Sequence, residues 1–325
     1  MVARFFLAGL DGSRSRRQFL RDLMSVSRFD KYNPLLAVFC GVWSTLLAGV
    51  NKMKIDPEGT SVFSVFRQTW LCFIYCWVLC GAGMVWNDWV DRDIDARVER
   101  TKNRPLASGR LTSADAFMWM GVQYIASCGI LYWMLDGHHF WASLLPVTVG
   151  TILYPYGKRP TAAKLRVYPQ YILGFTLSYP AVTGWSSIFG AEQTTGEVIS
   201  HCLPLLLFGF FWTIYFNTAY SYQDVVDDTK MSVNSSYVAA GRYIHMMVIV
   251  LGLMVLGSIP FVLVGLGSTW LWLSWMGVWS ISYLEQFAKF DAKRPETGGL
   301  VHRRNRTLGL WTIAVLSMEA ILQTL

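Results

Sequence analysis

The chain has 325 residues, of which 53% are hydrophobic and 15% are charged. Ordinary soluble domains carry about a quarter charged residues, so this composition excludes a large soluble domain and predicts a membrane protein. The formal net charge of +7 would suit a nucleic-acid partner, and only the placement of the basic residues relative to the apolar stretches can decide this.

The N-terminal segment is basic and contains a short apolar run, Phe5 to Leu10, which is too brief for the apolar core of a secretory signal. We expect residues 1–33 to form a basic cytoplasmic arm, for which a mitochondrial address stays open. Residues 34–325 are expected to form one transmembrane domain.

Apolar windows bounded by charged and turn residues predict an all-α bundle of about nine transmembrane helices. The expected helices cover residues 34–50, 62–86, 115–135, 139–156, 168–188, 202–222, 242–266, 268–286 and 308–325. Pro146, Pro180 and Pro260 fall inside these ranges and predict kinks. The cysteines of the second range, Cys72, Cys76 and Cys80, are interpreted as small packing residues. The five histidines form no metal-binding spacing with them, and we assign the histidines no chemistry.

With nine helices, the N-terminus and every second loop share one side of the membrane. All but three of the 28 lysines and arginines then lie on that side, and the exceptions are Lys52, Lys54 and Arg67. Basic loops mark the cytoplasmic side, so the N-terminus is predicted to be cytoplasmic. This segregation accounts for the net charge, and we expect neither a nucleic-acid partner nor an obligate protein partner.

A first group of polar residues directly follows the second expected helix. Asn87, Asp91 and Asp95 are four residues apart, so a continuing helix would place them on one face at the membrane boundary. Asp88 lies in the same segment, beside Asn87.

A second group closes the sixth expected helix. Asn217, Tyr220, Asp224, Asp227 and Asp228 have the spacing of one helical stripe. By the predicted topology both groups open to the same side, where they can face each other across one cavity.

Carboxylates at this density repel one another and are costly near hydrocarbon. A divalent cation resolves the conflict, and Mg²⁺ suits carboxylates that share it with substrate phosphates. Basic residues in the same loops would take the remaining phosphate charge. These residues are Arg92, Lys102, Arg104, Lys158, Arg159 and Lys230. The alternative is that the aspartates only neutralise the arginines of the basic side.

Together these residues resemble the UbiA superfamily of intramembrane aromatic prenyltransferases. The first motif of that family, Asn-Asp-x-x-Asp-x-x-x-Asp, matches Asn87 to Asp95, and the second, Asp-x-x-x-Asp, matches Asp224 to Asp228. Two loop segments also match, Arg104-Pro105-Leu106-Ala107-Ser108-Gly109 and Tyr154-Pro155-Tyr156-Gly157-Lys158-Arg159. The resemblance extends from about residue 28 to residue 241.

One position departs from the ubiquinone-pathway members of this family, which carry an aspartate where this chain has Asn217. The departure disfavours plain 4-hydroxybenzoate as the acceptor. The sequence resembles more closely the fungal meroterpenoid branch, whose members attach farnesyl or similar groups to aromatic polyketides.

The resemblance implies an enzyme that transfers a prenyl group, expected to be farnesyl, from an allylic diphosphate to an aromatic acceptor and releases pyrophosphate. Mg²⁺ is the implied cofactor, and the lipid bilayer is the implied surrounding. The implied catalytic residues are Asp91, Asp95, Asp224 and Asp228. The implied metal ligands are Asn87, Asp91, Asp95, Asp224 and Asp228, with Asp88 and Asp227 in lesser roles. The implied substrate-binding residues are Arg104, Lys158, Arg159, Lys230, Arg28, Tyr154 and Tyr220, and Arg28 could hold either an acceptor carboxylate or the diphosphate.

Other functions stay open at this point. These are a 4-hydroxybenzoate polyprenyltransferase of ubiquinone synthesis, a UbiA-like terpene cyclase with the same metal site, and an ion-coupled transporter. A phosphatidyltransferase of the CDP-alcohol type is disfavoured, because Asp95-Ala96-Arg97 lacks the glycine of its motif. We expect an endomembrane location, in the ER or Golgi, rather than the mitochondrial inner membrane, with the active site on the cytoplasmic side.

Overall fold

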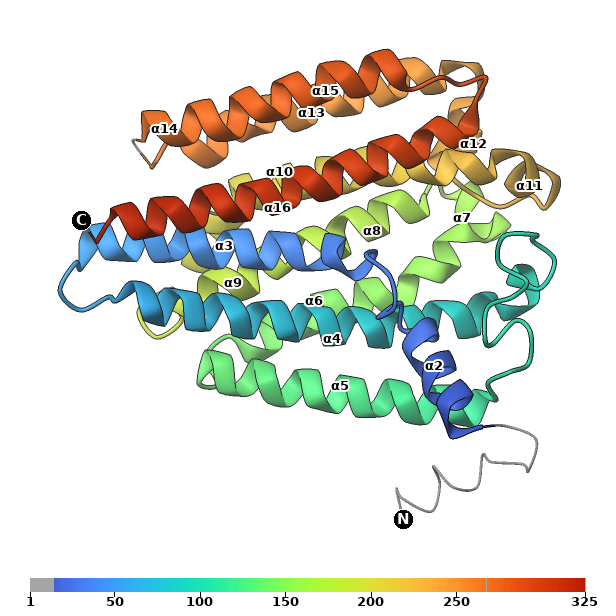
Figure 1. Ribbon diagram of the computed structural model, residues 1–325, viewed down its shortest axis with the longest axis horizontal. Coiled ribbons are helices and arrows are strands. Elements are labelled where there is room, and N and C mark those ends of the chain that lie inside the picture. The colour runs from blue at the N-terminus through green and yellow to red at the C-terminus, as the bar shows by residue number, and fades with distance from the viewer. Residues whose placement is uncertain (1–14, 267, 325) are drawn as a thin grey trace.

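The structure is a computed structural model that describes residues 15–266 and 268–324. Within these residues the chain is helical and contains no strand. Figure 1 shows the long helices lying side by side as a bundle, with their axes roughly parallel. The longer helices are α2 (Arg16–Val26), α3 (Pro34–Ile55), α4 (Val62–Asp95), α5 (Ser113–Leu135), α6 (Phe140–Leu153), α8 (Pro169–Ser178), α9 (Pro180–Phe189), α10 (Thr195–Ser221), α13 (Ile244–Leu263), α15 (Val278–Lys289) and α16 (Gly298–Leu322). The shorter segments are η1 (Tyr154–Lys158), α7 (Pro160–Lys164), η2 (Tyr222–Asp224), α11 (Val225–Lys230), α12 (Ser236–Ala240), η3 (Gly241–Tyr243), α14 (Thr269–Leu271), η4 (Trp272–Gly277) and η5 (Pro295–Thr297).

The predicted all-α fold is confirmed, and helix occupies each of the ranges expected from the sequence. Four helical stretches are long and apolar enough to cross a membrane by length and composition alone. They are Pro34–Ile55, Val62–Asp95, Thr195–Lys230 and Ser236–Leu263. The number of membrane crossings therefore stays a prediction.

Prolines act differently at the three positions where kinks are expected. Pro146 and Pro260 lie within α6 and α13, which continue through them. The range 168–188 is instead divided, because α8 ends at Ser178 and α9 begins at Pro180. Proline has no backbone N–H to continue the helical ladder, and it fits the first turn of a new helix.

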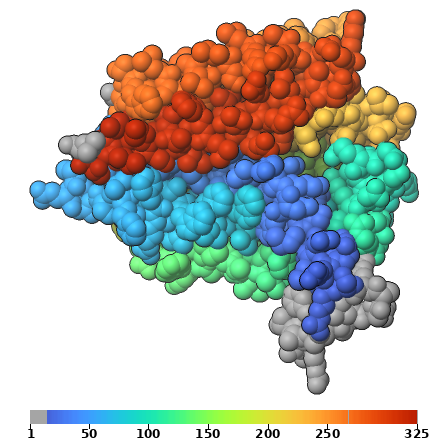
Figure 2. Space-filling view, in the orientation of Figure 1, coloured from blue at the N-terminus to red at the C-terminus, as the bar shows by residue number. Residues whose placement is uncertain are grey.

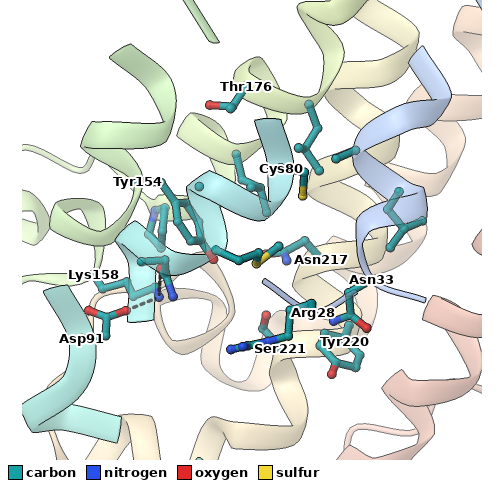
Figure 3. A pocket seen from close by; sticks show the side chains of 18 of the residues that line it. Arg28, Asn33, Cys80, Asp91, Tyr154, Lys158, Thr176, Asn217, Tyr220 and Ser221 are labelled. Carbon is teal, nitrogen blue, oxygen red and sulfur yellow. Dashed lines mark hydrogen bonds and ion pairs between the residues drawn. The ribbon is translucent and has the colours of Figure 1, made fainter. Parts of the chain in front are cut away.

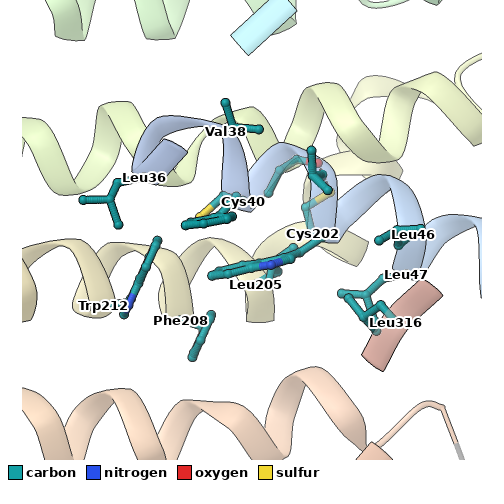
Figure 4. Packing of buried hydrophobic residues seen from close by; sticks show 14 of the residues in the cluster. Leu36, Val38, Cys40, Leu46, Leu47, Cys202, Leu205, Phe208, Trp212 and Leu316 are labelled. Carbon is teal, nitrogen blue, oxygen red and sulfur yellow. Dashed lines mark hydrogen bonds between the residues drawn. The ribbon is translucent and has the colours of Figure 1, made fainter. Parts of the chain in front are cut away.

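Helix α3 lies at the centre of the bundle and packs against α4, α9 and α16. Its Trp43 is fully buried, stacks on Phe39 at 5.4 Å between ring centroids, and lies 5.0 Å from the ring of Trp212 on α10. The Trp43 indole N–H donates to the carbonyl of Gly309 on α16 at 3.2 Å. A Cβ on Gly309 would lie 2.4 Å from the Phe39 ring, so glycine permits this close approach. Figure 4 shows the α3 and α10 side chains of this core facing each other.

The described part of the N-terminal arm is folded against the bundle. Helix α2 begins after Ser15, whose hydroxyl accepts from the N–H of Gln18. Its apolar face packs on α4 and on the loop that follows α4, through Phe19, Leu23, Val26, Val85, Leu106 and Leu111. Figure 2 shows α2, this loop and the segment around α11 together at one end of the molecule.

Candidate active site

The first polar group lies on one face of a continuous helix, as the spacing predicts. Helix α4 runs without a break to Asp95, and Asn87, Asp91 and Asp95 all line one cavity. Asp88, one position after Asn87, points elsewhere and is only 1% exposed.

The second polar group does not form the single helical stripe that the spacing suggested. Helix α10 ends at Ser221, a 3₁₀ turn covers Tyr222–Asp224, and α11 begins at Val225. A 3₁₀ turn has three residues per turn instead of 3.6, so it changes the directions of the side chains that follow. As a result Asp224 and Asp228 line the cavity, whereas Asp227 does not.

The cavity has a volume of about 540 Å³ and lies between the two polar groups. Its walls come from the turn before α3, α3, α4, the loop after α4, α6, η1, α8, α9, α10, α12 and α16, among other segments. In Figure 3, Asp91, Lys158 and Tyr154 lie on one side of the cavity, and Asn217, Tyr220 and Asn33 lie on the other.

Asp91 is held by two basic side chains that follow α6. The Lys158 ammonium lies 2.5 Å from Asp91 Oδ2 and donates to Asn87 Oδ1 at 2.9 Å. The Arg159 guanidinium donates to Asp91 Oδ1 at 3.0 Å. Lys158 also lies over the ring of Tyr154, 4.8 Å from its centroid. The loop that matches the family's Tyr-Pro-x-x-Lys-Arg segment is therefore bonded directly to the first motif.

Two arginines bind the other two aspartates of this motif, Asp88 and Asp95. Arg28 makes two 2.8 Å hydrogen bonds from one nitrogen to the carboxylate of Asp88, and Arg104 donates to Asp88 at 3.1 Å and to Asp95 at 2.6 Å. The backbone at Arg28 has φ 61°, a conformation that L-residues seldom adopt, and its guanidinium also donates to the carbonyls of Ser25 and Val26. Asp88 thus anchors two arginines that line the cavity.

On the opposite wall, the two aspartates have different partners. Arg100 forms a double hydrogen bond with Asp224, Nε to Oδ1 at 2.8 Å and a terminal nitrogen to Oδ2 at 2.5 Å. Tyr237, on α12, donates its hydroxyl to Asp228. Sequence reasoning missed both partners, although Arg100 lies in the same basic loop as Arg104, and that loop was the available signal.

The basic partners stay charged across the physiological range. Burial alone would lower the pKa of Lys158, but the neighbouring Asp91, Tyr154 and Asp95 raise it above its ordinary value. Burial would likewise lower the pKa of Arg100, and its bond to Asp224 outweighs this and raises that pKa.

Several predicted site residues lie outside the cavity wall. Arg159 contacts Asp91 but does not line the cavity, and Lys230 is exposed. Arg28, Arg104, Lys158, Tyr154 and Tyr220 do line it, together with Asn87, Asp91, Asp95, Asp224 and Asp228.

The donor set suits a hard divalent cation, because carboxylate and amide oxygens from both walls open onto one cavity. Among the described residues, no three acidic, histidine or cysteine side chains are already gathered closely enough to hold a metal ion. Each carboxylate instead holds a basic or hydroxyl partner, and most of these partners are side chains that can bind phosphate. The residues present therefore fit Mg²⁺ by their chemistry. The basic side chains that now pair with these carboxylates could move to phosphate oxygens when the metal binds.

Comparison with known proteins identifies the family of this chain. The model of the UbiA prenyltransferase family matches residues 36–305. The chain belongs to the UbiA prenyltransferase family, and it is an integral membrane protein with prenyltransferase activity. The resemblance inferred from the two motifs is confirmed.

Curated fungal relatives match nearly the whole chain. The polyprenyl transferase dpchC of Colletotrichum higginsianum is 52% identical over 306 residues, which cover 94% of this chain and 97% of that protein. The polyprenyl transferase cle5 of Aspergillus versicolor is 50% identical over 311 residues, 95% of this chain and 97% of its own. These relatives agree with the expected fungal branch.

Solved structures share the fold at low sequence identity. A UbiA homolog from Aeropyrum pernix in its apo form has a TM-score of 0.64 and 17% identity, and the match covers 90% of this chain and 98% of that one. A UbiA homolog from Archaeoglobus fulgidus, bound to GPP and Mg²⁺, has a TM-score of 0.52 and 13% identity, with 87% and 100% covered.

Proposed function

We propose that the chain is a Mg²⁺-dependent aromatic prenyltransferase of meroterpenoid biosynthesis. It would transfer a farnesyl group from its diphosphate to a hydroxylated, electron-rich ring, phenolic or polyketide-derived, and release pyrophosphate. The observation that carries this proposal is that two clusters of aspartates lie on facing walls of one cavity. Each cluster is bonded to basic side chains, and the part of the cavity below them is lined by apolar residues.

Mg²⁺ bound by Asn87, Asp91 and Asp95 on one wall and by Asp224 and Asp228 on the other would stabilise the charge that builds on the leaving pyrophosphate. A solved protein of the same fold is bound to GPP and Mg²⁺, which supports Mg²⁺ as the cation and a prenyl diphosphate as the donor. Asp88 is proposed as an anchor for arginines rather than a ligand, because it does not line the cavity, is only 1% exposed and accepts from the buried Arg28.

The chain's own cations would bind the diphosphate. Lys158, Arg104 and Arg100 line the cavity and contact carboxylates there, so they can transfer their hydrogen bonds to phosphate oxygens when a donor arrives. Donors held ready at the place where negative charge develops lower the barrier without reorganisation during the reaction. Arg159 would keep Asp91 in position through its hydrogen bond from outside the cavity.

The apolar lower part of the cavity would take the prenyl tail. Its lining includes Leu79, Cys80, Val147, Leu177 and Pro180. Tyr75 is the lowest residue of α4 that lines it, about three helical turns or 18 Å below Asn87. Carbon–carbon bonds near 1.5 Å give an isoprene unit a length of about 5 Å, so this depth suits the three units of farnesyl.

The surrounding membrane and orientation are part of the proposal. We place the chain in an endomembrane with the cavity open to the cytoplasm, because the basic loops gather on that side of the predicted topology. Both substrates would then reach the cavity from the cytoplasmic leaflet.

The test is product analysis with membranes that contain the protein, supplied with Mg²⁺ and with geranyl, farnesyl or geranylgeranyl diphosphate. The acceptor panel is 4-hydroxybenzoate, orsellinic acid and triacetic acid lactone. A prenylated ring that disappears with EDTA supports the proposal. Pyrophosphate with only a hydrocarbon or terpene alcohol would identify a cyclase, and no pyrophosphate with any donor would overturn the metal–diphosphate site and favour a transporter.

A further inference from the structure

The wall opposite α4 carries polar side chains that have no hydrogen-bond partner among the described residues. They include Asn33 before α3, Asn217, Tyr220 and Ser221 on α10, and His302 on α16, and all of these line the cavity. The carboxylates of Asp91, Asp95, Asp224 and Asp228, in contrast, all accept hydrogen bonds from other side chains. The polar side chains without a partner therefore have hydrogen-bonding capacity left for a ligand, and the carboxylates have less. Side chains with unused hydrogen-bonding capacity that face a cavity are available to a polar ligand there.

His302 is the most deeply buried of these side chains, with 9% of its surface exposed. Its ring lies 4.4 Å from that of Tyr220, centroid to centroid, and 6.1 Å from that of Phe216. Its nitrogens are not among the polar atoms sealed inside the protein without a partner. The imidazole is therefore held by aromatic neighbours with its polar atoms left for a ligand in the cavity.

We propose that His302 accepts the hydroxyl proton of the acceptor ring and so activates that ring for prenylation. This role rests on the proposed function and adds to it a catalytic residue and an acceptor subsite. Asn217 and Ser221, on the neighbouring turns of α10, would bind other oxygens of the same acceptor. The diphosphate would lie between the two groups of carboxylates, and the acceptor would lie beside it, against α10 and α16.

The proposed step balances as follows. The hydroxyl proton passes to a nitrogen of His302 while a π electron pair of the ring forms the bond to the first carbon of the prenyl group. The bond from that carbon to the diphosphate oxygen breaks, and its electron pair leaves with pyrophosphate. The resulting dienone loses its ring proton to water and regains a hydroxyl proton from the imidazolium. Each transfer releases one pyrophosphate and one proton.

His302 has a free lone pair at pH 7 but is a weak base, so it accepts the proton only as the new carbon–carbon bond makes the ring hydroxyl strongly acidic. Burial, followed by the nearby Arg306 and Arg303, lowers the pKa of His302 to about 4, at a position that precedes the apolar stretch predicted to enter the membrane. The imidazole is therefore neutral at pH 7 and has a free lone pair. The other titratable group packed on the ring is Tyr220 of α10.

The test compares His302→Phe, which keeps an aromatic ring against Tyr220 but has no nitrogen, with the control His245→Phe at an exposed position outside the cavity. The probes are farnesyl diphosphate and the panel acceptor that the wild-type protein prenylates best. We expect the kcat for prenylation to fall about 100-fold in His302→Phe. The KM for the donor and the acceptor-free release of pyrophosphate should stay within two-fold of the wild-type values. The defect should shrink as the pH approaches about 10, where a phenol ionises without help.

The outcomes separate this inference from the proposed function. Unchanged prenylation by His302→Phe, or a parallel loss of acceptor-free pyrophosphate release, overturns the role of His302. A defect that does not change with pH also overturns it, because His302 would then only shape the site. If the wild-type protein prenylates no acceptor, the proposed function itself fails.

Discussion

Arg100 and Asp224 join the two sides of the cavity. The guanidinium extends from the loop after α4 and makes a double hydrogen bond to a carboxylate at the end of α10, with distances of 2.8 Å and 2.5 Å. The Arg100 side chain is half exposed and that of Asp224 is mostly buried, so the pair lies at the boundary with solvent. A metal ion that uses Asp224 must first displace Arg100.

This competition predicts that Arg100→Gln will bind Mg²⁺ more tightly in the absence of a donor. An exposed ion pair contributes about 0.2–1 kcal/mol, so the gain in affinity should be about 1.4- to five-fold. Titration calorimetry of the purified protein in detergent measures this directly. Weaker Mg²⁺ binding by the variant would show that Arg100 supports the ligand set instead of competing with it.

The break between α10 and α11 predicts that neighbouring aspartates differ in importance. Asp228→Asn should lower kcat/KM for prenyl transfer by about 100- to 1,000-fold, because it removes a charge from the cavity wall. Asp227→Asn should have little effect, because Asp227 does not line the cavity. Steady-state kinetics with farnesyl diphosphate compare the two variants, and equal losses would contradict the geometry of this segment.

The same assay applies to α4. Asp91→Asn should lose activity to a similar extent as Asp228→Asn, since it removes a proposed metal ligand and the partner of Lys158. Asp93→Asn is the matched control, because the Asp93 side chain is 81% exposed on the other face of the helix. Full activity of Asp91→Asn would contradict the proposal that the first motif binds the metal.

Asp88 should be required for folding more than for chemistry. Asp88→Leu leaves Arg28 buried without its carboxylate, and breaking a buried ion pair costs about 3–5 kcal/mol of stability. The double variant with Arg28→Met should recover much of this loss, because it removes the unpaired charge as well. Thermal unfolding in detergent provides the comparison, and a double variant no more stable than Asp88→Leu would rule out this explanation.

Cys80 should control the length of the donor. Its side chain faces the cavity about two helical turns, or 10 Å, below Asn87, so a larger group there would leave space for two isoprene units. Cys80→Phe should therefore shift the preference from farnesyl to geranyl diphosphate. The control is Cys128→Phe, on α5 outside the cavity. Competition between the two donors, read by product mass, gives the ratio, and an unchanged ratio in Cys80→Phe would place the tail elsewhere.

The parts of the site that sequence could predict are those set by local geometry. Asn87, Asp91 and Asp95 share a face because α4 is regular through all three, and a four-residue spacing then fixes their direction. The positions of the helices could be predicted from the apolar stretches, because these too depend only on residues close together in the sequence.

The rest of the site depends on contacts between distant segments. Whether Asp88 binds metal or arginine depends on where Arg28 lies, 60 residues earlier in the chain. His302 showed no signal, since a lone histidine near an apolar stretch has no recognisable spacing, and only the packing of α16 on α10 brings it to the cavity. The 3₁₀ turn at Tyr222–Asp224 interrupts a pattern that the sequence alone describes as regular.

The central position of α3 has a consequence for biogenesis. Of the most apolar window of this helix, 89% is buried inside the folded protein, and much of that cover comes from α9 and α16, which are synthesised later. The indole of Trp43 finds its acceptor, Gly309, only when α16 is present. Helix α3, the earliest of the four long apolar stretches in the described residues, would therefore remain in lipid or beside the insertion machinery until these later helices are translated. Final assembly of this enzyme is a late event, and the catalytic cavity is completed at the same moment, because α16 also brings in His302.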